Sequence, residues 1–141
     1  VEKEKPTISR HPADVAQQRL VAFAVEVIRL ASRLPKTVPA RHIARQLVRS
    51  GTSPAPNYGE ARGAESRKDF IHKPGVGLKE LNETIVWLNI ISGSGLLKTE
   101  ELHRCSRECD ELARIIAQCL KTAKSRSRQV SNSDYAIFNN Q

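Results

Sequence analysis

Apolar side chains recur at alternating steps of three and four along most of the chain, which is the spacing of one face of an α-helix. The first pattern follows Pro12 and ends at Pro35, where a proline stops the helix. A second follows residues 37–40, and its inner face carries Ile43 and Leu47. No stretch of several residues alternates strictly between apolar and polar, so we expect no β-sheet. The first helix has these apolar positions: Leu20, Phe23, Ala24, Val27, Ile28, Leu30, Ala31 and Leu34.

Two more helices follow after a segment in which Pro54 and Pro56 are expected to distort or end the second helix. The third spans about 64–91, and the fourth begins near Thr99 after the turn at 92–95. The third helix is expected to bury Phe70, Leu78, Leu81, Ile85 and Leu88. The fourth is expected to bury Leu102, Cys105, Cys109, Leu112, Ile116, Cys119 and Ala123.

Four helices with short connections predict an all-α protein, an antiparallel up-down four-helix bundle. We expect the bundle to occupy residues 13–125. Residues 1–12 are charged and contain prolines, which is typical of a disordered N-terminal segment. Residues 126–141 lose the helical periodicity and are expected to form a flexible C-terminal tail.

A proline and two glycines interrupt the third pattern, at Pro74, Gly75 and Gly77. They lack the spacing and the preceding strand of a phosphate-binding loop. A proline inside a helix donates no N–H, and its ring clashes with the carbonyl four residues earlier, at a cost of about 3 kcal/mol. We therefore expect the third helix to be kinked near Pro74.

Fragments of metal-site motifs occur, but their side chains are not expected to point into the core of the bundle. Glu100-x-x-His103 and Asp69-x-x-His72 resemble the Glu-x-x-His of di-iron bundles, yet Leu102 and Phe70 take the expected inward positions. The three cysteines lie on the core seam, where thiols act as small hydrophobic groups. No serine or cysteine is paired with a base by a motif. We expect no enzyme activity, no metal and no cofactor.

The chain is basic, with 23 Lys and Arg against 15 Asp and Glu and a formal net charge of +8. Arg41, Arg45 and Arg49 are four residues apart and form one stripe, and Arg45 lies about 200° from Ile43 on the helix wheel, so the stripe is expected to face outward. Cations so placed neutralise nucleic-acid phosphates, although a solvated surface explains them equally well. The candidate nucleic-acid-binding residues are Arg41, Arg45, Arg49, Arg62, Arg67, Lys68, Lys73 and Lys79. Near the end of the chain follow Lys121, Lys124, Arg126 and Arg128.

Aromatic residues make up 4% of the chain, which argues against sequence-specific reading of single strands by base stacking. No run of about 18 apolar residues exists, and the first residues lack the apolar centre of a signal peptide. An odd number of cysteines fits reduced thiols better than a disulfide framework. We therefore expect a cytoplasmic protein that spans no membrane.

Residues 50–97 carry a combination of short motifs that resembles a known bacterial family. These motifs are Asn57 and Glu60, Ser66, Lys68-Asp69-Phe70, Leu81-Asn82-Glu83-Thr84, Trp87-Leu88 and Gly95-Leu96-Leu97. They are similar to those of the small four-helix bundle proteins encoded in intervening sequences of large-subunit ribosomal RNA genes. The likeness covers about residues 13–124. Pro74 departs from it, because the family carries a large apolar residue there in a continuous helix.

The resemblance implies a ring, typically a homopentamer, without established enzymatic activity. A more distant relative is the accessory protein of diversity-generating retroelements, a basic pentamer that associates with a reverse transcriptase and nucleic acid. Surplus apolar residues near the end of the third helix, Trp87, Ile90 and Ile91, are the expected subunit interface. We predict a non-catalytic, oligomeric binding or scaffold protein that engages RNA or DNA backbone. The alternative is an adaptor that binds a protein partner, such as a polymerase or reverse transcriptase, without touching nucleic acid.

Overall fold

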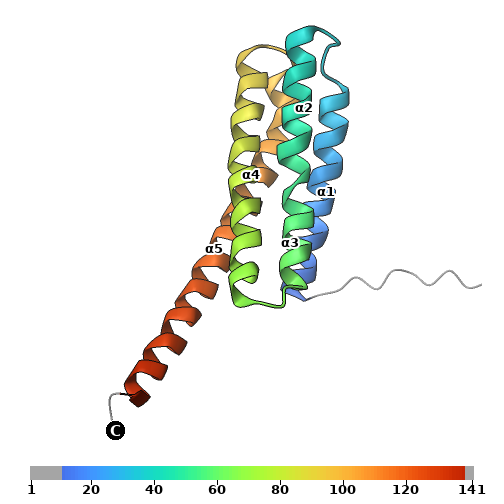
Figure 1. Cartoon of the computed structure of the whole chain (residues 1–141). Helices are drawn as coiled ribbons and strands as arrows, with labels where there is room; N and C mark the ends of the chain where they lie inside the picture. Colours follow the sequence, from blue (N-terminus) through green and yellow to red (C-terminus); the bar gives the residue numbers. More distant parts are fainter. Residues whose placement is uncertain (1–10, 139–141) are drawn as a thin grey trace, which may run out of the picture.

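The computed structural model describes the backbone of residues 11–138 and the side chains of residues 11–130. All regular structure in this part is helical. The helices are α1 (Pro12–Ser32), α2 (Val38–Thr52), α3 (Pro54–Arg62), α4 (Arg67–Gly93) and α5 (Thr99–Phe138). Because α3 continues the direction of α2, the chain forms four rods that run up, down, up and down (Figure 1). The predicted all-α antiparallel four-helix bundle is confirmed.

The four rods form a square in which each rod packs on two neighbours. The α1 helix contacts α2 and α3 on one side and α5 on the other, and α4 likewise contacts α2, α3 and α5. Within the described residues α1 makes no close backbone approach to α4, and α5 makes none to α2 or α3. The α1 and α4 helices therefore occupy opposite corners, and their outer faces point in different directions.

An aliphatic core fills the centre of the square, as the periodicity predicts. Phe23, Leu47, Leu81 and Leu112 are fully buried, one from each rod. Two predicted core positions are wrong in α1 and α4: Ile28 and Phe70 are 47% exposed. Phe70 has the helical phase of a core residue, but it lies in the first turn of α4, where α5 has already begun to leave the bundle (Figure 1).

The main interruption lies at Ser53 and Pro54, between α2 and α3, and not at Pro74. Ser53 still has its carbonyl satisfied, because the Asn57 side-chain amide donates to it at 2.9 Å. The α4 helix runs without a break through Pro74, near which a kink was predicted. Gly77 faces the start of α3, and a Cβ at this position would lie 3.6 Å from Pro54 Cα, which is an ordinary van der Waals distance.

Both ends of the chain were predicted to lack regular structure. Residues 1–10 lie outside the described residues, and α1 begins at Pro12, with His11 Nδ1 accepting the Ala13 N–H at 3.3 Å. At the other end, α5 extends to Phe138 and includes most of the residues predicted to form a flexible tail. Its last part projects beyond the bundle (Figure 1). None of the helices in the described part is both long and apolar enough to cross a membrane.

Candidate nucleic-acid interface and neighbouring surfaces

The arginines of α2 divide into two groups. Arg41 and Arg45 are exposed while Ile43 is buried, as the spacing predicts. Arg49 instead reaches α4, where its Nη1 lies 3.1 Å from Glu80 Oε2 and its Nη2 contacts Glu83. The hydrogen bond from Arg49 and a second from Trp87 Nε1 lower the pKa of Glu83. Arg49 therefore links α2 to α4, with two carboxylates facing one guanidinium.

Two more of the eight predicted cations are also paired with carboxylates. Arg62 contacts Asp14 of α1, and Lys73 Nζ lies 2.7 Å from Glu60 Oε2 of α3. Five cations remain exposed and without an ion pair in the described part of the chain: Arg41, Arg45, Arg67, Lys68 and Lys79. They do not form one surface, because α2 begins at the upper end of the bundle and α4 at the lower end (Figure 1).

A second basic surface lies on α5, and it joins Lys121 and Arg128, which the sequence pointed to, with two arginines that it did not. Arg107, Arg114, Lys121 and Arg128 are spaced by seven residues, so they share one helix face, and all four are exposed. Successive members are about 10.5 Å apart along the helix axis, from the rise of about 1.5 Å per residue. We call these four residues the α5 basic stripe.

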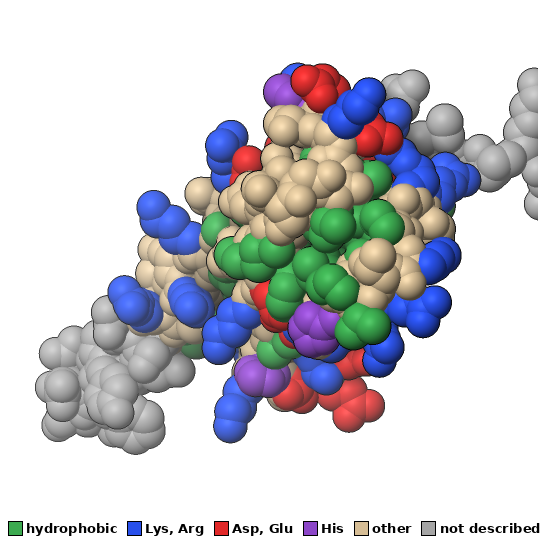
Figure 2. Space-filling model, turned by 90° about the horizontal axis from the view of Figure 1, so that it is seen from above, with side chains coloured by type: hydrophobic (Ala, Val, Ile, Leu, Met, Phe, Trp, Pro, Cys, Tyr) green, Lys and Arg blue, Asp and Glu red, His purple; other side chains and the backbone are tan. Residues whose placement is uncertain are grey.

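No carboxylate offsets the lower part of this stripe. The chain contains no Asp or Glu from residue 112 to residue 130, and none of the four cations has an ion pair within the described residues. In Figure 2 the lobe on the left, next to the grey end of α5, carries Lys and Arg side chains. The spacing of seven residues in the sequence indicates this shared helix face. The steps of four on which the predicted stripe of α2 was based do not include it.

Apolar side chains are exposed on both diagonal helices. On α4, Val86 and Ile90 point outward at 55% and 38% exposure. On α1 the exposed apolar residues Val21, Val25 and Ile28 follow one another at steps of four and three. We call these two sets the α4 face and the α1 face. Figure 2, viewed onto the end where the α1–α2 and α4–α5 connections lie, shows further hydrophobic side chains gathered there.

The three residues predicted at the subunit contact have different surroundings. Ile91 is fully buried in the core of its own bundle and is unavailable to a partner. Trp87 is half-buried, donates to Glu83 Oε1 at 3.1 Å and meets His42 edge-on at 6.1 Å between ring centroids. Of the three predicted residues, Ile90 presents the exposed apolar surface. The α1 face was missed because Ile28 was assigned to the core.

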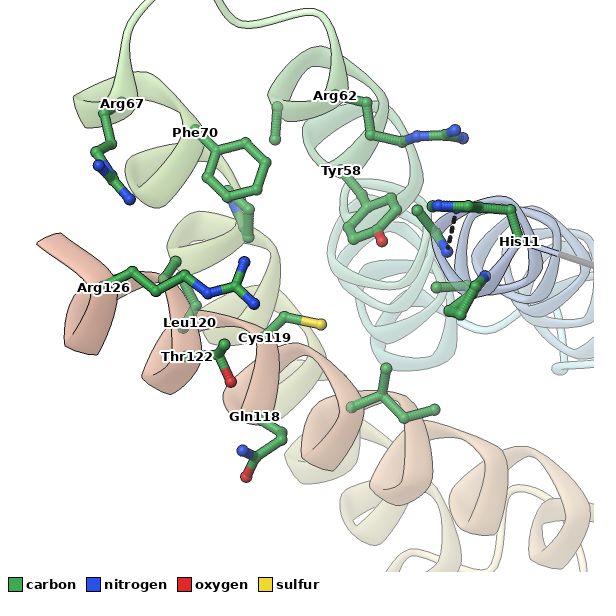
Figure 3. Close-up of a pocket in the computed structure, with 17 residues that line it drawn as sticks. His11, Tyr58, Arg62, Arg67, Phe70, Gln118, Cys119, Leu120, Thr122 and Arg126 are labelled. Atoms are coloured by element: carbon green, nitrogen blue, oxygen red, sulfur yellow. Dashed lines mark hydrogen bonds between the residues drawn. The ribbon is translucent and has the colours of Figure 1, made fainter.

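A pocket of about 640 Å³ opens at the lower end of the bundle, where α5 diverges (Figure 3). Its wall is mostly apolar and comes from four helices, with Ala16 of α1, Tyr58 and Ala61 of α3, Phe70 and Pro74 of α4, and Leu120 of α5. The small side chains of Ala16 and Ala61 and the compact ring of Pro74 leave space where larger side chains would fill the core. We call this cavity the open-end pocket.

The cysteines have different surroundings. Cys105 and Cys109 are buried, and burial raises the pKa of the Cys105 thiol to about 12 and raises that of Cys109 as well. Cys109 Sγ donates to the Leu81 carbonyl at 3.3 Å. Cys119 was predicted to be in the core, but it is exposed and lines the open-end pocket. In the described part of the chain no group of three or more His, Cys, Asp or Glu side chains could hold a metal ion.

The fold and these surfaces define a basic, all-helical bundle protein with two exposed apolar faces. The family model of the 23S rRNA-intervening sequence protein matches residues 14–118, and the chain belongs to this family. The match ends before the lower part of α5, so Cys119, Lys121 and Arg128 lie beyond it.

One similar solved structure is the crystal structure of a protein of unknown function from the S23 ribosomal protein family of Bacteroides thetaiotaomicron. The two chains are 30% identical, with a TM-score of 0.70, and the match covers 75% of this chain and 98% of the other. A comparison with curated proteins finds no match.

Proposed function

We propose that this protein is a non-catalytic, homo-oligomeric scaffold whose basic surface binds the backbone of RNA or DNA. The observation that carries the proposal is the α5 basic stripe: four exposed cations on one helix face, without ion pairs among the described residues. Unpaired cations contribute more to phosphate binding than paired ones, because no protein carboxylate has to be displaced. Arg49, Arg62 and Lys73 are therefore weaker candidates than the stripe.

The stripe suits a polyanion that extends along a helix. Its four members span about 31 Å of the axis, from the rise of about 1.5 Å per residue. Each phosphate contact releases condensed counterions, which makes binding weaken steeply with salt. Side chains that contact only phosphates carry no sequence information, so we expect modest sequence preference.

The test is a fluorescence-anisotropy titration of the purified protein with duplex and single-stranded RNA and DNA at 50 and 200 mM salt. We expect binding at low salt that weakens at least ~10-fold at 200 mM, because four phosphate contacts correspond to a log–log slope of about −3. An uncharged polymer of the same length serves as control. Absence of binding at 50 mM to every nucleic acid would contradict the proposal.

Assembly is supported by the two apolar faces. They lie on α1 and α4, at opposite corners of the bundle, and contain different residues. A contact between the α1 face of one copy and the α4 face of the next is heterologous, and such contacts close into a ring when the rotation permits. The family resemblance favours five copies. A ring would repeat the α5 basic stripe around its axis and increase the avidity for a polyanion.

Light scattering at micromolar concentration is expected to give a mass several-fold above the 15.7 kDa of one chain. Replacing one exposed valine on each face with lysine, as Val25→Lys with Val86→Lys, is expected to reduce the mass to that of the monomer, because a buried unpaired charge is costly. The variant Ala117→Lys with Gln118→Lys adds the same charge on exposed positions of α5 and serves as control. A monomeric wild-type protein would remove this part of the proposal.

The second candidate function is an adaptor that binds another protein through the same apolar faces. The exposure of Val86 and Ile90 on α4 favours it. Affinity capture of the tagged protein from its own cells, with and without nuclease, separates the two functions. A partner retained after nuclease treatment supports the adaptor, and partners lost with the nucleic acid support the scaffold.

A further inference from the structure

The open-end pocket has a size and lining that the proposed nucleic-acid binding does not use. Its volume of about 640 Å³ lies within the range of about 300–1,000 Å³ typical of small-molecule sites. Such sites are mostly apolar and contain a few polar groups that orient the ligand. Phosphate backbone does not fit an apolar wall, so this cavity calls for a different ligand.

The apolar wall carries two hydroxyls, those of Tyr58 and Thr122. Tyr58 and Cys119 face each other across the cavity, from α3 and α5 (Figure 3). The Tyr58 hydroxyl makes no hydrogen bond to the described residues. Burial raises the pKa of the Tyr58 phenol, so it stays protonated at neutral pH and can donate to a ligand oxygen.

The mouth of the pocket is positively charged. Arg67 of α4 and Arg126 of α5 lie at the same side of the opening, with the exposed ring of Phe70 beside them (Figure 3). Neither arginine has an ion pair among the described residues, whereas Arg62 points away toward α1 and is paired with Asp14. A guanidinium can bind a carboxylate through two parallel hydrogen bonds.

We infer that the open-end pocket binds a small amphipathic anion, a molecule with an apolar chain or ring body and one acidic group. The body contacts Ala16, Phe70 and Leu120, and the acidic group pairs with Arg67 and Arg126 at the mouth. Charge complementarity favours this ligand over an apolar neutral molecule or a cation. Because Cys119, Leu120 and Arg126 lie beyond residue 118, part of the site falls outside the region that the family model matches.

Cys119 provides a readout inside the pocket. It is the exposed cysteine among the three, while Cys105 and Cys109 are buried. The rate at which N-ethylmaleimide alkylates Cys119, followed by peptide mass spectrometry, therefore reports access to the cavity. The probes are decanoate and decyltrimethylammonium below their micelle concentrations, which share a chain length and differ in the sign of the head group.

We expect decanoate to slow the alkylation of Cys119 at least ~10-fold at saturation, and decyltrimethylammonium to leave it nearly unchanged. The variant Arg67→Gln with Arg126→Gln is expected to need ~10-fold more decanoate for the same protection. The matched control, Arg114→Gln with Lys121→Gln, removes two cations from the outer face of α5 and is expected to bind decanoate like the wild type.

A second variant tests the cavity itself. Ala123→Phe places a large ring among the lining residues and is expected to abolish the heat of decanoate binding in calorimetry, with helical content checked by circular dichroism. Equal protection of Cys119 by decanoate and decyltrimethylammonium would contradict the inference that the ligand is an anion. No protection by either would overturn the site. Protection that grows with protein concentration in the absence of probe would mean that a second copy covers the pocket, which also overturns the inference.

Because nucleic-acid binding is measured separately, failure here leaves the scaffold proposal standing. Conversely, loss of phosphate binding in α5 stripe variants does not affect the pocket, since none of the four stripe residues lines it.

Discussion

Replacing Arg107, Arg114, Lys121 and Arg128 with glutamine is expected to lower the affinity for nucleic acid on the order of 100-fold or more at low salt. The physical reason is the loss of four unpaired cations from one helix face, each of which releases about 0.7–0.9 counterions on contacting a phosphate. The slope of log affinity against log salt should therefore become shallower by about 3. Anisotropy titrations at four salt concentrations measure both quantities.

The fold should tolerate these changes. All four residues are exposed, and surface substitutions away from special features usually change stability by less than about 0.5 kcal/mol. The matched comparison is Arg41→Gln with Arg45→Gln, which removes two exposed cations from α2 and is expected to reduce the slope by less than about 2. A quadruple variant whose slope equals that of the wild type would show that α5 does not contact phosphate.

Replacing Gly51 with alanine is expected to destabilise the protein by about 1–3 kcal/mol, the range for overpacking a filled core. A Cβ at this position would lie 2.7 Å from Val27 Cγ1 and 2.8 Å from Val27 Cγ2. Val27 is fully buried, and its β-branched side chain is stiff at χ1. The glycine of α2 therefore permits the close contact between α2 and α1. Urea denaturation at fixed protein concentration measures the change.

The substitution Gly75→Ala is expected to have the opposite effect on stability. A Cβ there would have nothing within 4 Å, and the residue lies inside α4. Alanine at this position is expected to stabilise the protein by about 0.5–1 kcal/mol, because glycine loses more backbone entropy in a helix. If Gly51→Ala were at least as stable as the wild type, or more stable than Gly75→Ala, the close contact between α1 and α2 described here would be wrong.

Several parts of the fold were predictable because they depend on local periodicity. Leu20, Leu81 and Leu112 were assigned to the core from steps of three and four, and all are buried. Phe70 and Cys119 follow the same periodicity but are exposed, because α5 diverges from the bundle at their level (Figure 1). The helical periodicity of a sequence indicates which face of a helix packs against the neighbouring helices. It does not indicate at which residue those helices cease to be in contact.

The candidate site was harder to predict than the fold. Arg41 and Arg45 face outward as expected, but Arg49 is paired with Glu80 and Glu83 from another helix. The positions of basic residues in the sequence do not distinguish an arginine that is free to bind phosphate from one that is paired with a carboxylate. The α5 basic stripe was visible in the spacing of the chain, yet its lack of partners became apparent only when the packing showed which carboxylates lie within reach.

The amino-acid sequence by itself determined the helices, their order and the outward direction of Arg41 and Arg45, because each follows from the 3.6-residue repeat and from nearest neighbours along the chain. Only the tertiary structure decided that α4 passes unbroken through Pro74, which cations are neutralised, and that a pocket opens between Ala16, Tyr58 and Leu120. These features depend on residues that are distant in the chain and become neighbours through packing, and that packing is a property of all four rods together.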